Sequence, residues 1–248
     1  MNTNDLSAAI AAVNAGQQVT LIASPVSFDI IDGQQQELQQ GNWGYRDGGT
    51  YGIGGVATRS HGTAQQKDGS QLFSITGPYK ATGLWYLKVP TVGWKSGQHV
   101  LSCDYMYLSG PDGMHELDGR AEDSNGDGEN CSTAYVKHYP DVAPDGSLVV
   151  SLSQGQWGVG KSGLTPSPFP VGIWVHRATV MEFDFEKEMF GIVGVQIGAN
   201  IYPVSQNFKA IPSNWTRNEM LIQVQPYCSA DTGSGPPLSV AVNHLSLV

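Results

Sequence analysis

The chain has 248 residues, with 13 Lys or Arg and 22 Asp or Glu, which gives a net charge of −9 at pH 7. Because the few basic residues are scattered singly, the composition argues against nucleic acid and anionic membrane surfaces as partners. The 31 Gly and 14 Pro are typical of many short strands joined by turns. The length suits one large β domain.

The first residues predict a short helix and no export signal. Residues 1–6 carry neither a basic region nor an apolar core, so we expect a protein without a signal peptide that is made in a cytosol. Leu6, Ile10 and Val13 have helical spacing, and Gly16 is a suitable C-terminal stop. We therefore predict a helical docking segment over residues 1–18 and a β domain over residues 19–248.

Alternating apolar residues predict the strands of an antiparallel β-sandwich. The expected strands are 19–23, 26–31, 71–75, 84–89, 99–108, 147–153, 173–185, 190–201, 219–225 and 238–247. Two Gly-rich regions, 33–70 and 109–146, are expected to be long loops, which are common places for function. The three cysteines, Cys103, Cys131 and Cys228, are too scattered for a disulfide framework.

Three strand sequences carry a resemblance to a known group. In order they are residues 97–105 (GQHVLSCDY), 173–178 (IWVHRA) and 242–247 (VNHLSL). They resemble strands of carbohydrate-binding modules and galactose-binding-like domains over roughly residues 70–248. The resemblance implies a jelly roll that binds glycans. Domains of this type are common in tailed-phage virions, so it also implies a virion protein.

The acidic segment 123–128 is a candidate calcium loop. Asp123, Asn125 and Asp127 place oxygen ligands at alternate positions, as calcium loops do. Ala134 occupies the position where an EF-hand has its bidentate glutamate, so an EF-hand is excluded. A non-helical calcium site and a solvated acidic turn both remain as interpretations.

Three acidic residues alternate with phenylalanine at 182–186. On a strand, Glu182, Asp184 and Glu186 would share one face, while Phe183 and Phe185 would share the other. The segment resembles the signature of laminarinase-like and carrageenase-like glycosidases. That resemblance implies Glu182 as nucleophile, Asp184 as helper and Glu186 as acid/base. The alternative is a polar outer face at a strand end.

Aromatic residues framed by glycine are candidate sugar platforms. Trp43 and Tyr45 lie beside Gly44, and Trp157 lies between Gly155 and Gly158. A flat ring on uncrowded backbone can stack on a sugar. The alternative is that Trp43 and Trp157 cap the ends of the core.

The sequence therefore predicts an all-β antiparallel jelly roll with a short N-terminal helix and long loops. We expect a non-enzymatic virion structural protein: a phage capsid decoration, fibre or tail surface protein. We expect a homo-oligomer that contacts other virion proteins and binds a glycan. The alternatives are a stand-alone carbohydrate-binding protein, and a laminarinase-like glycoside hydrolase or polysaccharide lyase. No cofactor is required, and Ca²⁺ is the one candidate.

Overall fold

The computed structural model describes residues 43–46, 58–63, 70–76, 83–109, 113–123, 132–138, 147–154, 163–228 and 238–247. These residues form fourteen strands in two seven-stranded antiparallel sheets. The expected helix and domain boundary at residue 18 lie outside the described residues, as do the expected strands 19–23 and 26–31. Within the described part no helix is long and apolar enough to cross a bilayer.

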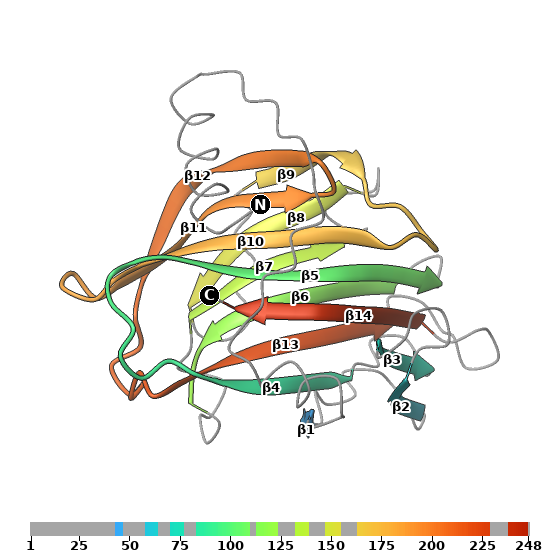
Figure 1. The fold of residues 1–248 in the computed structure, drawn as a ribbon, viewed down its shortest axis with the longest axis horizontal. Helices are drawn as coiled ribbons and strands as arrows, with labels where there is room; N and C mark the ends of the chain where they lie inside the picture. Colours follow the sequence, from blue (N-terminus) through green and yellow to red (C-terminus); the bar gives the residue numbers. More distant parts are fainter. Residues whose placement is uncertain are drawn as a thin grey trace.

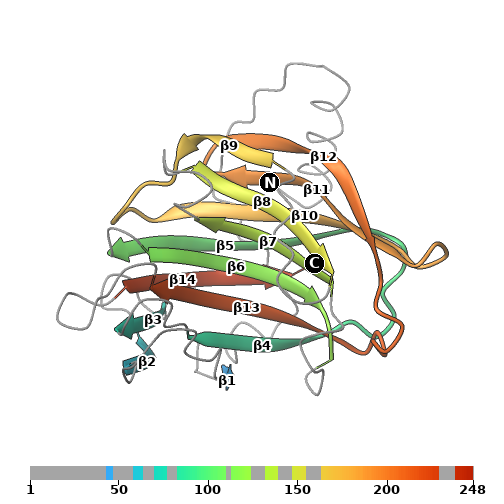
Figure 2. The same cartoon turned by 180° about the vertical axis from the view of Figure 1, so that it is seen from behind.

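Sheet 1 has the order β1-β4-β13-β6-β7-β8-β9. Its strands are β1 (Gly44–Arg46), β4 (Leu84–Pro90), β13 (Glu219–Cys228), β6 (Gly113–Ala121), β7 (Ser132–His138), β8 (Ser147–Gln154) and β9 (Gly163–Pro168). Sheet 1 lies at the back in Figure 1 and at the front in Figure 2.

Sheet 2 has the order β12-β11-β10-β5-β14-β3-β2. Its strands are β12 (Asn200–Ala210), β11 (Met189–Ile197), β10 (Val175–Asp184), β5 (Gly97–Ser109), β14 (Leu238–Leu247), β3 (Gln71–Thr76) and β2 (Thr58–Thr63). Each neighbouring pair is antiparallel. The predicted all-β antiparallel sandwich is confirmed, and the three strands that carry the resemblance, β10, β5 and β14, are neighbours in sheet 2.

The core lies between the sheets and follows the period-2 alternation of the strands. On β5 the odd-numbered residues from Leu101 to Tyr107 face the core, and the even-numbered ones face outward. Phe183 on β10 is 1% exposed and packs against Phe190, with ring centroids 4.6 Å apart. The predicted facing of the 173–185 strand is therefore correct.

The two regions expected to be loops contain strands. Residues 33–70 include β1 and β2, and residues 109–146 include β6 and β7. β6 was missed because Glu116, Asp118 and Arg120 on its outer face make the segment read as polar. Its inward residues, Leu117 among them, lie in the core.

One expected strand is in fact two. Residues 190–201 divide into β11 and β12, because the chain turns at Gly198, whose φ is 58°. The amide of Gly198 donates to the carbonyl of His176, 2.7 Å away. A left-handed conformation of this kind favours glycine.

Strand β9 has no counterpart among the expected strands.

Candidate functional site

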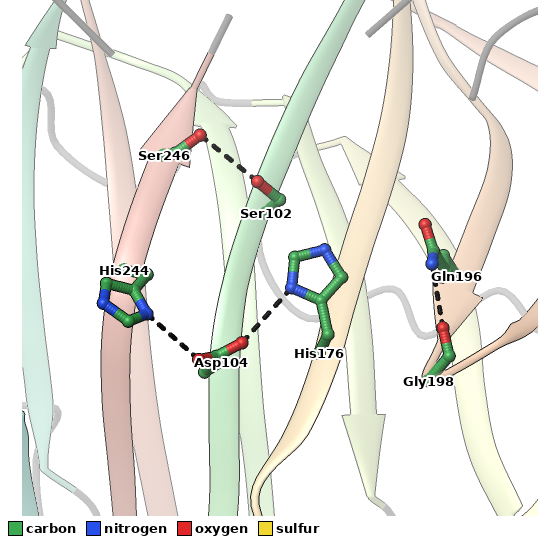
Figure 3. Close-up of polar contacts among 7 residues, drawn as sticks. All are labelled: Ser102, Asp104, His176, Gln196, Gly198, His244 and Ser246. Atoms are coloured by element: carbon green, nitrogen blue, oxygen red, sulfur yellow. Dashed lines mark hydrogen bonds and ion pairs between the residues drawn. The ribbon is translucent and has the colours of Figure 1, made fainter. Parts of the chain in front are cut away.

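The centre of sheet 2 carries a polar cluster on its outer face. Asp104 on β5 is opposite His176 on β10 and opposite Asn243 on β14. Directly paired residues of an antiparallel sheet share a face. Figure 3 shows Asp104 between His176 and His244, each from a different strand. Side chains far apart in the sequence therefore meet on one surface.

The Asp104 carboxylate contacts both imidazoles. Its Oδ1 lies 3.3 Å from His176 Nδ1, and its Oδ2 lies 3.0 Å from His244 Nδ1. The side chains of Asp104, His176 and His244 are 21%, 26% and 47% exposed. An ionised carboxylate only accepts hydrogen bonds, so each Nδ1 donates and each ring keeps its Nε2 for another partner. The cluster is thus oriented and reachable from solvent.

A β-bulge places His244 in this cluster. The register of β14 against β5 shifts between Asn243 and Ser246, and His244 has φ 48°. A bulge lets two consecutive residues face one partner residue. A left-handed residue other than glycine costs of order 1–3 kcal/mol, and such strain is found mainly at functional positions.

Asn243 adds an acceptor beside the carboxylate. Its side chain belongs to a residue that is 3% exposed, and its Oδ1 makes no hydrogen bond within the described part of the chain. Buried amide oxygens are normally satisfied.

Trp174 supplies an aromatic surface next to the polar cluster. It precedes His176 by two residues, about 7 Å along an extended chain. Its indole packs beside Met106 and Ala241 on the same outer face and is half-buried. The neighbouring Ile173 and Val171 are 59% and 58% exposed. An apolar rim therefore borders the polar cluster.

Further contacts fix the floor of the site. Ser102 and Ser246 share a hydrogen bond of 3.2 Å between β5 and β14, and Gln196 Nε2 donates to the carbonyl of Gly198 at 2.8 Å. Figure 3 shows the serine pair near Asp104 and the Gln196–Gly198 contact on the far side of His176. These groups already pair with each other, whereas His176 and His244 each keep Nε2 for another partner.

The outer face of sheet 1 holds a second polar set, but it is buried. Arg120 donates to Gln223 Oε1 at 2.8 Å and pairs with Glu122 at 3.2 Å, while Gln223 Nε2 donates to Gln225 at 3.1 Å and to Asp118 at 3.4 Å. Every member is at most 9% exposed. This network joins β6 to β13, and it is far less accessible than the cluster on sheet 2.

The three candidate catalytic carboxylates do not form a row on one strand. β10 ends at Asp184, so Glu186 lies in the following turn. Asp184 accepts from the amides of Glu186 and Lys187 and pairs with Lys187 Nζ at 2.6 Å. Hydrogen bonds from Lys187 hold the pKa of Asp184 below its ordinary value. Glu182 contacts Gln98 at 3.5 Å.

The candidate sugar platforms are placed differently from one another. Trp43 is 9% exposed and packs edge-on against Phe73 in the core, with centroids 4.7 Å apart. Trp43 is therefore a core residue, which agrees with the alternative interpretation that it caps the core. Tyr45 lies on β1, opposite Trp85 of β4. Trp157 lies outside the described residues.

Asp123 is the described member of the candidate calcium loop. Its two oxygens accept from the amide and the hydroxyl of Thr216, at 2.8 and 2.6 Å. Asn125 and Asp127 lie outside the described residues, and the residues that are described contain no group of three metal-ligating side chains. Calcium binding stays a prediction.

Sequence reasoning missed the residues of the sheet 2 cluster. Asp104, His176 and His244 all lie within the three strand sequences that carried the resemblance, and Trp174 alternates with His176. The alternation of Trp174 and His176 was the one sequence pattern that could have indicated a shared outer face. Nothing in the sequence indicates that β10, β5 and β14 are neighbours in that order.

Comparison with known proteins gives the fold. The sequence matches no known family model, and no curated protein sequence is significantly similar. The chain is similar to the solved structure of the alginate lyase Aly36B in complex with alginate trisaccharide, with TM-score 0.53 and 12% identity over 82% of this chain and 96% of the lyase. The carbohydrate-binding module CBM66 from Bacillus subtilis (TM-score 0.44, 11% identity, 78% and 94% covered) and winged bean acidic lectin (0.46, 9%, 81% and 95%) are also similar.

Proposed function

We propose that the protein binds a glycan on the outer face of sheet 2 and does no chemistry on it. The observation that carries this proposal is the cluster of Asp104, His176, His244 and Asn243 beside the half-exposed Trp174. A sugar ring has an apolar face that stacks on an indole and hydroxyls that need acceptors and donors. The cluster offers both within a few residues.

The charge of the site favours a neutral glycan. The chain carries a net charge of −9, and the site has a carboxylate at its centre. A uronate polymer would bring further negative charge next to Asp104, which is unfavourable at low ionic strength. Aly36B binds an alginate trisaccharide, so the shared fold is compatible with a glycan ligand. The carboxylate in the site of this protein favours a neutral glycan over the anionic alginate.

Among the described residues, the site holds no carboxylate pair of the kind that glycosidases use. Such enzymes need two carboxyl groups about 5–5.5 Å or 6.5–9.5 Å apart. Glu182 shares the outer face with His176, but it lies six residues further along β10, about 20 Å away. Asp104 is also engaged by two imidazoles. These distances support binding without hydrolysis.

The binding test uses neutral oligosaccharides. Titration calorimetry with laminarihexaose and galactohexaose compares the wild type with Trp174→Ala and His176→Ala, and alginate hexaose serves as the anionic comparison. Tyr86→Ala, on the outer face of sheet 1, is the matched aromatic control. We expect the two site variants to bind about tenfold more weakly than the wild type, and the control to bind with wild-type affinity. Wild-type affinity in Trp174→Ala would contradict the site.

Catalysis is tested on the corresponding polysaccharides. We expect no reducing-sugar release and no unsaturated product from laminarin, galactan or alginate. Product formation by the wild type would replace the binding proposal with an enzymatic one, and its loss in Glu182→Gln would assign it to the glycosidase-like residues.

The setting that we propose is a virion surface, where the protein acts as a decoration, fibre or tail protein with other virion proteins and copies of itself. This part rests on the sequence resemblance alone. Mass spectrometry and immunogold labelling of purified particles would test it, and absence from particles would leave the stand-alone carbohydrate-binding protein.

A further inference from the structure

Three loops meet at one end of the sandwich. They are residues 91–96 between β4 and β5, residues 185–188 between β10 and β11, and residues 211–218 between β12 and β13. They lie at the left of Figure 1 and at the right of Figure 2. This end is opposite to the start of β10, where Trp174 lies.

Hydrogen bonds tie these loops together. The amide of Phe185 donates to Ser96 Oγ at 2.9 Å, and the amide of Thr91 donates to the carbonyl of Asn218 at 2.9 Å. The amide of Ile211 donates to the carbonyl of Glu188 at 2.7 Å. Each loop is bonded to a neighbouring one, so the surface that they form is held in a defined shape.

A row of rings runs across this end. Trp94 stacks on His99 with centroids 3.8 Å apart and planes 5° apart, and its edge meets Phe183 at 5.6 Å. Phe183 stacks on Phe185 at 5.5 Å, and the Arg217 guanidinium lies 4.9 Å from the Phe185 centroid. Trp94, His99, Phe185 and Arg217 all keep part of their surface in solvent.

Backbone strain concentrates here too. Glu188 and Arg217 have φ 53° and 62°, and their side chains pair at 3.4 Å. Among the described residues these are two of the three non-glycine residues with positive φ, and the third is His244 in the sheet 2 cluster. Residues held in this conformation tend to gather at binding sites. The same backbone conformation therefore occurs in the sheet 2 cluster and at this loop end.

We infer that this loop end is a second glycan site, with Trp94 as its stacking platform. One face of the indole is fixed by His99, so little side-chain entropy is lost when a sugar covers the remaining surface. Arg217 and Glu188 lie at the far end of the row, where they offer a donor and an acceptor to hydroxyls. The ligand class, a neutral oligosaccharide, rests on the proposed function; the location does not.

The two sites are separate. Trp94 packs against His99, and Trp174 packs against Met106. His99 and Met106 are seven residues apart on β5, which is about 23 Å along the strand. A short oligosaccharide bound at one indole does not reach the other. Two sites on one chain would raise the avidity for a polysaccharide or cross-link two chains of it.

Saturation-transfer NMR with laminaritriose and galactotriose tests the second site, because it detects weak binding and these sugars are too short to reach both indoles. The proteins are the wild type, Trp94→Ala, Trp174→Ala and the double variant, each checked by thermal melting. Arg217→Ala provides a variant on the rim of the same surface. We expect each Trp variant to keep part of the signal, the double variant to lose it, and Arg217→Ala with Trp174→Ala to bind about tenfold more weakly than Trp174→Ala.

The outcomes separate the two proposals. Complete loss in Trp174→Ala would overturn the loop site and leave the sheet 2 site. No change in Trp174→Ala with complete loss in Trp94→Ala would overturn the sheet 2 site and leave the loop site. A folded Trp94→Ala that binds as the wild type does would overturn the loop site, and a wild type that binds neither sugar would overturn both.

Discussion

Arg177 on β10 donates from Nη2 to the main-chain carbonyl of Val136 on β7, 2.8 Å away, and so bonds sheet 2 to sheet 1 through the core. The residue is 1% exposed, and its guanidinium carbon lies 4.8 Å from the centroid of the Tyr105 ring. Nη1 makes no hydrogen bond within the part of the chain that is described. A buried cation with incomplete pairing is expensive in free energy.

Arg177→Met should therefore cost less than about 1 kcal/mol of unfolding free energy or even stabilise the protein, because an apolar chain of similar length fills the space without a charge. Arg177→Ala should cost about 3 kcal/mol, since it leaves a cavity between the sheets. Urea unfolding of both variants measures the difference. Equal losses would show that the charge itself stabilises the sandwich.

Phe183→Ala should lower the unfolding free energy by about 3–5 kcal/mol, because its ring is 1% exposed and packs among other core rings. Val92→Ala, on a side chain 75% exposed, is the control and should cost less than about 0.5 kcal/mol. Both values come from denaturant unfolding. A loss below about 1 kcal/mol for Phe183→Ala would be inconsistent with its position in the core.

The buried thiol of Cys103 should make the folded protein less stable at high pH. Burial raises the pKa of its thiol from 9.0 to about 12, with Arg177 opposing that change. Between these two values the unfolded chain releases the thiol proton and the folded chain keeps it, so the unfolding free energy falls as pH rises from 9 towards 12. Below pH 9 the thiol is protonated in both states and contributes no slope.

The check on Cys103 compares unfolding free energies of the wild type and Cys103→Ala at several pH values from 8 to 11. Burial also raises the pKa of Tyr105 well above its ordinary value, so both proteins should lose stability, but the wild type should lose more per pH unit. Parallel curves would mean that the thiol of Cys103 ionises as easily in the folded state as in the unfolded one.

Calcium at residues 123–128 is best tested through Asp127. If the segment holds the ion, millimolar Ca²⁺ should raise the melting temperature by mass action, and Asp127→Ala should abolish the rise. Asp123→Ala is less informative, because Asp123 also binds Thr216 and its loss would loosen the 211–218 loop. A melting temperature unchanged by Ca²⁺ in the wild type would favour the acidic turn.

Alternation along single strands was readable because each strand buries every second residue. Phe183 and the closing strand 238–247 follow from that pattern, and the observed β14 has the same bounds. The pattern failed on β6, where charged outward residues hide a strand whose other face is in the core. It also failed at Glu186, because a turn begins one residue after Asp184 and is held by the Asp184 carboxylate.

The sequence by itself determined the class of fold, since period-2 burial and frequent turns leave few alternatives to an antiparallel sandwich. It also supplied the strands that bear Asp104, His176 and His244. Only the tertiary structure decided that β10, β5 and β14 are neighbours and that a bulge turns His244 towards Asp104. Strand order and register depend on contacts between distant residues, such as Ser74 and Ser239, which are 165 positions apart, and no local pattern specifies them.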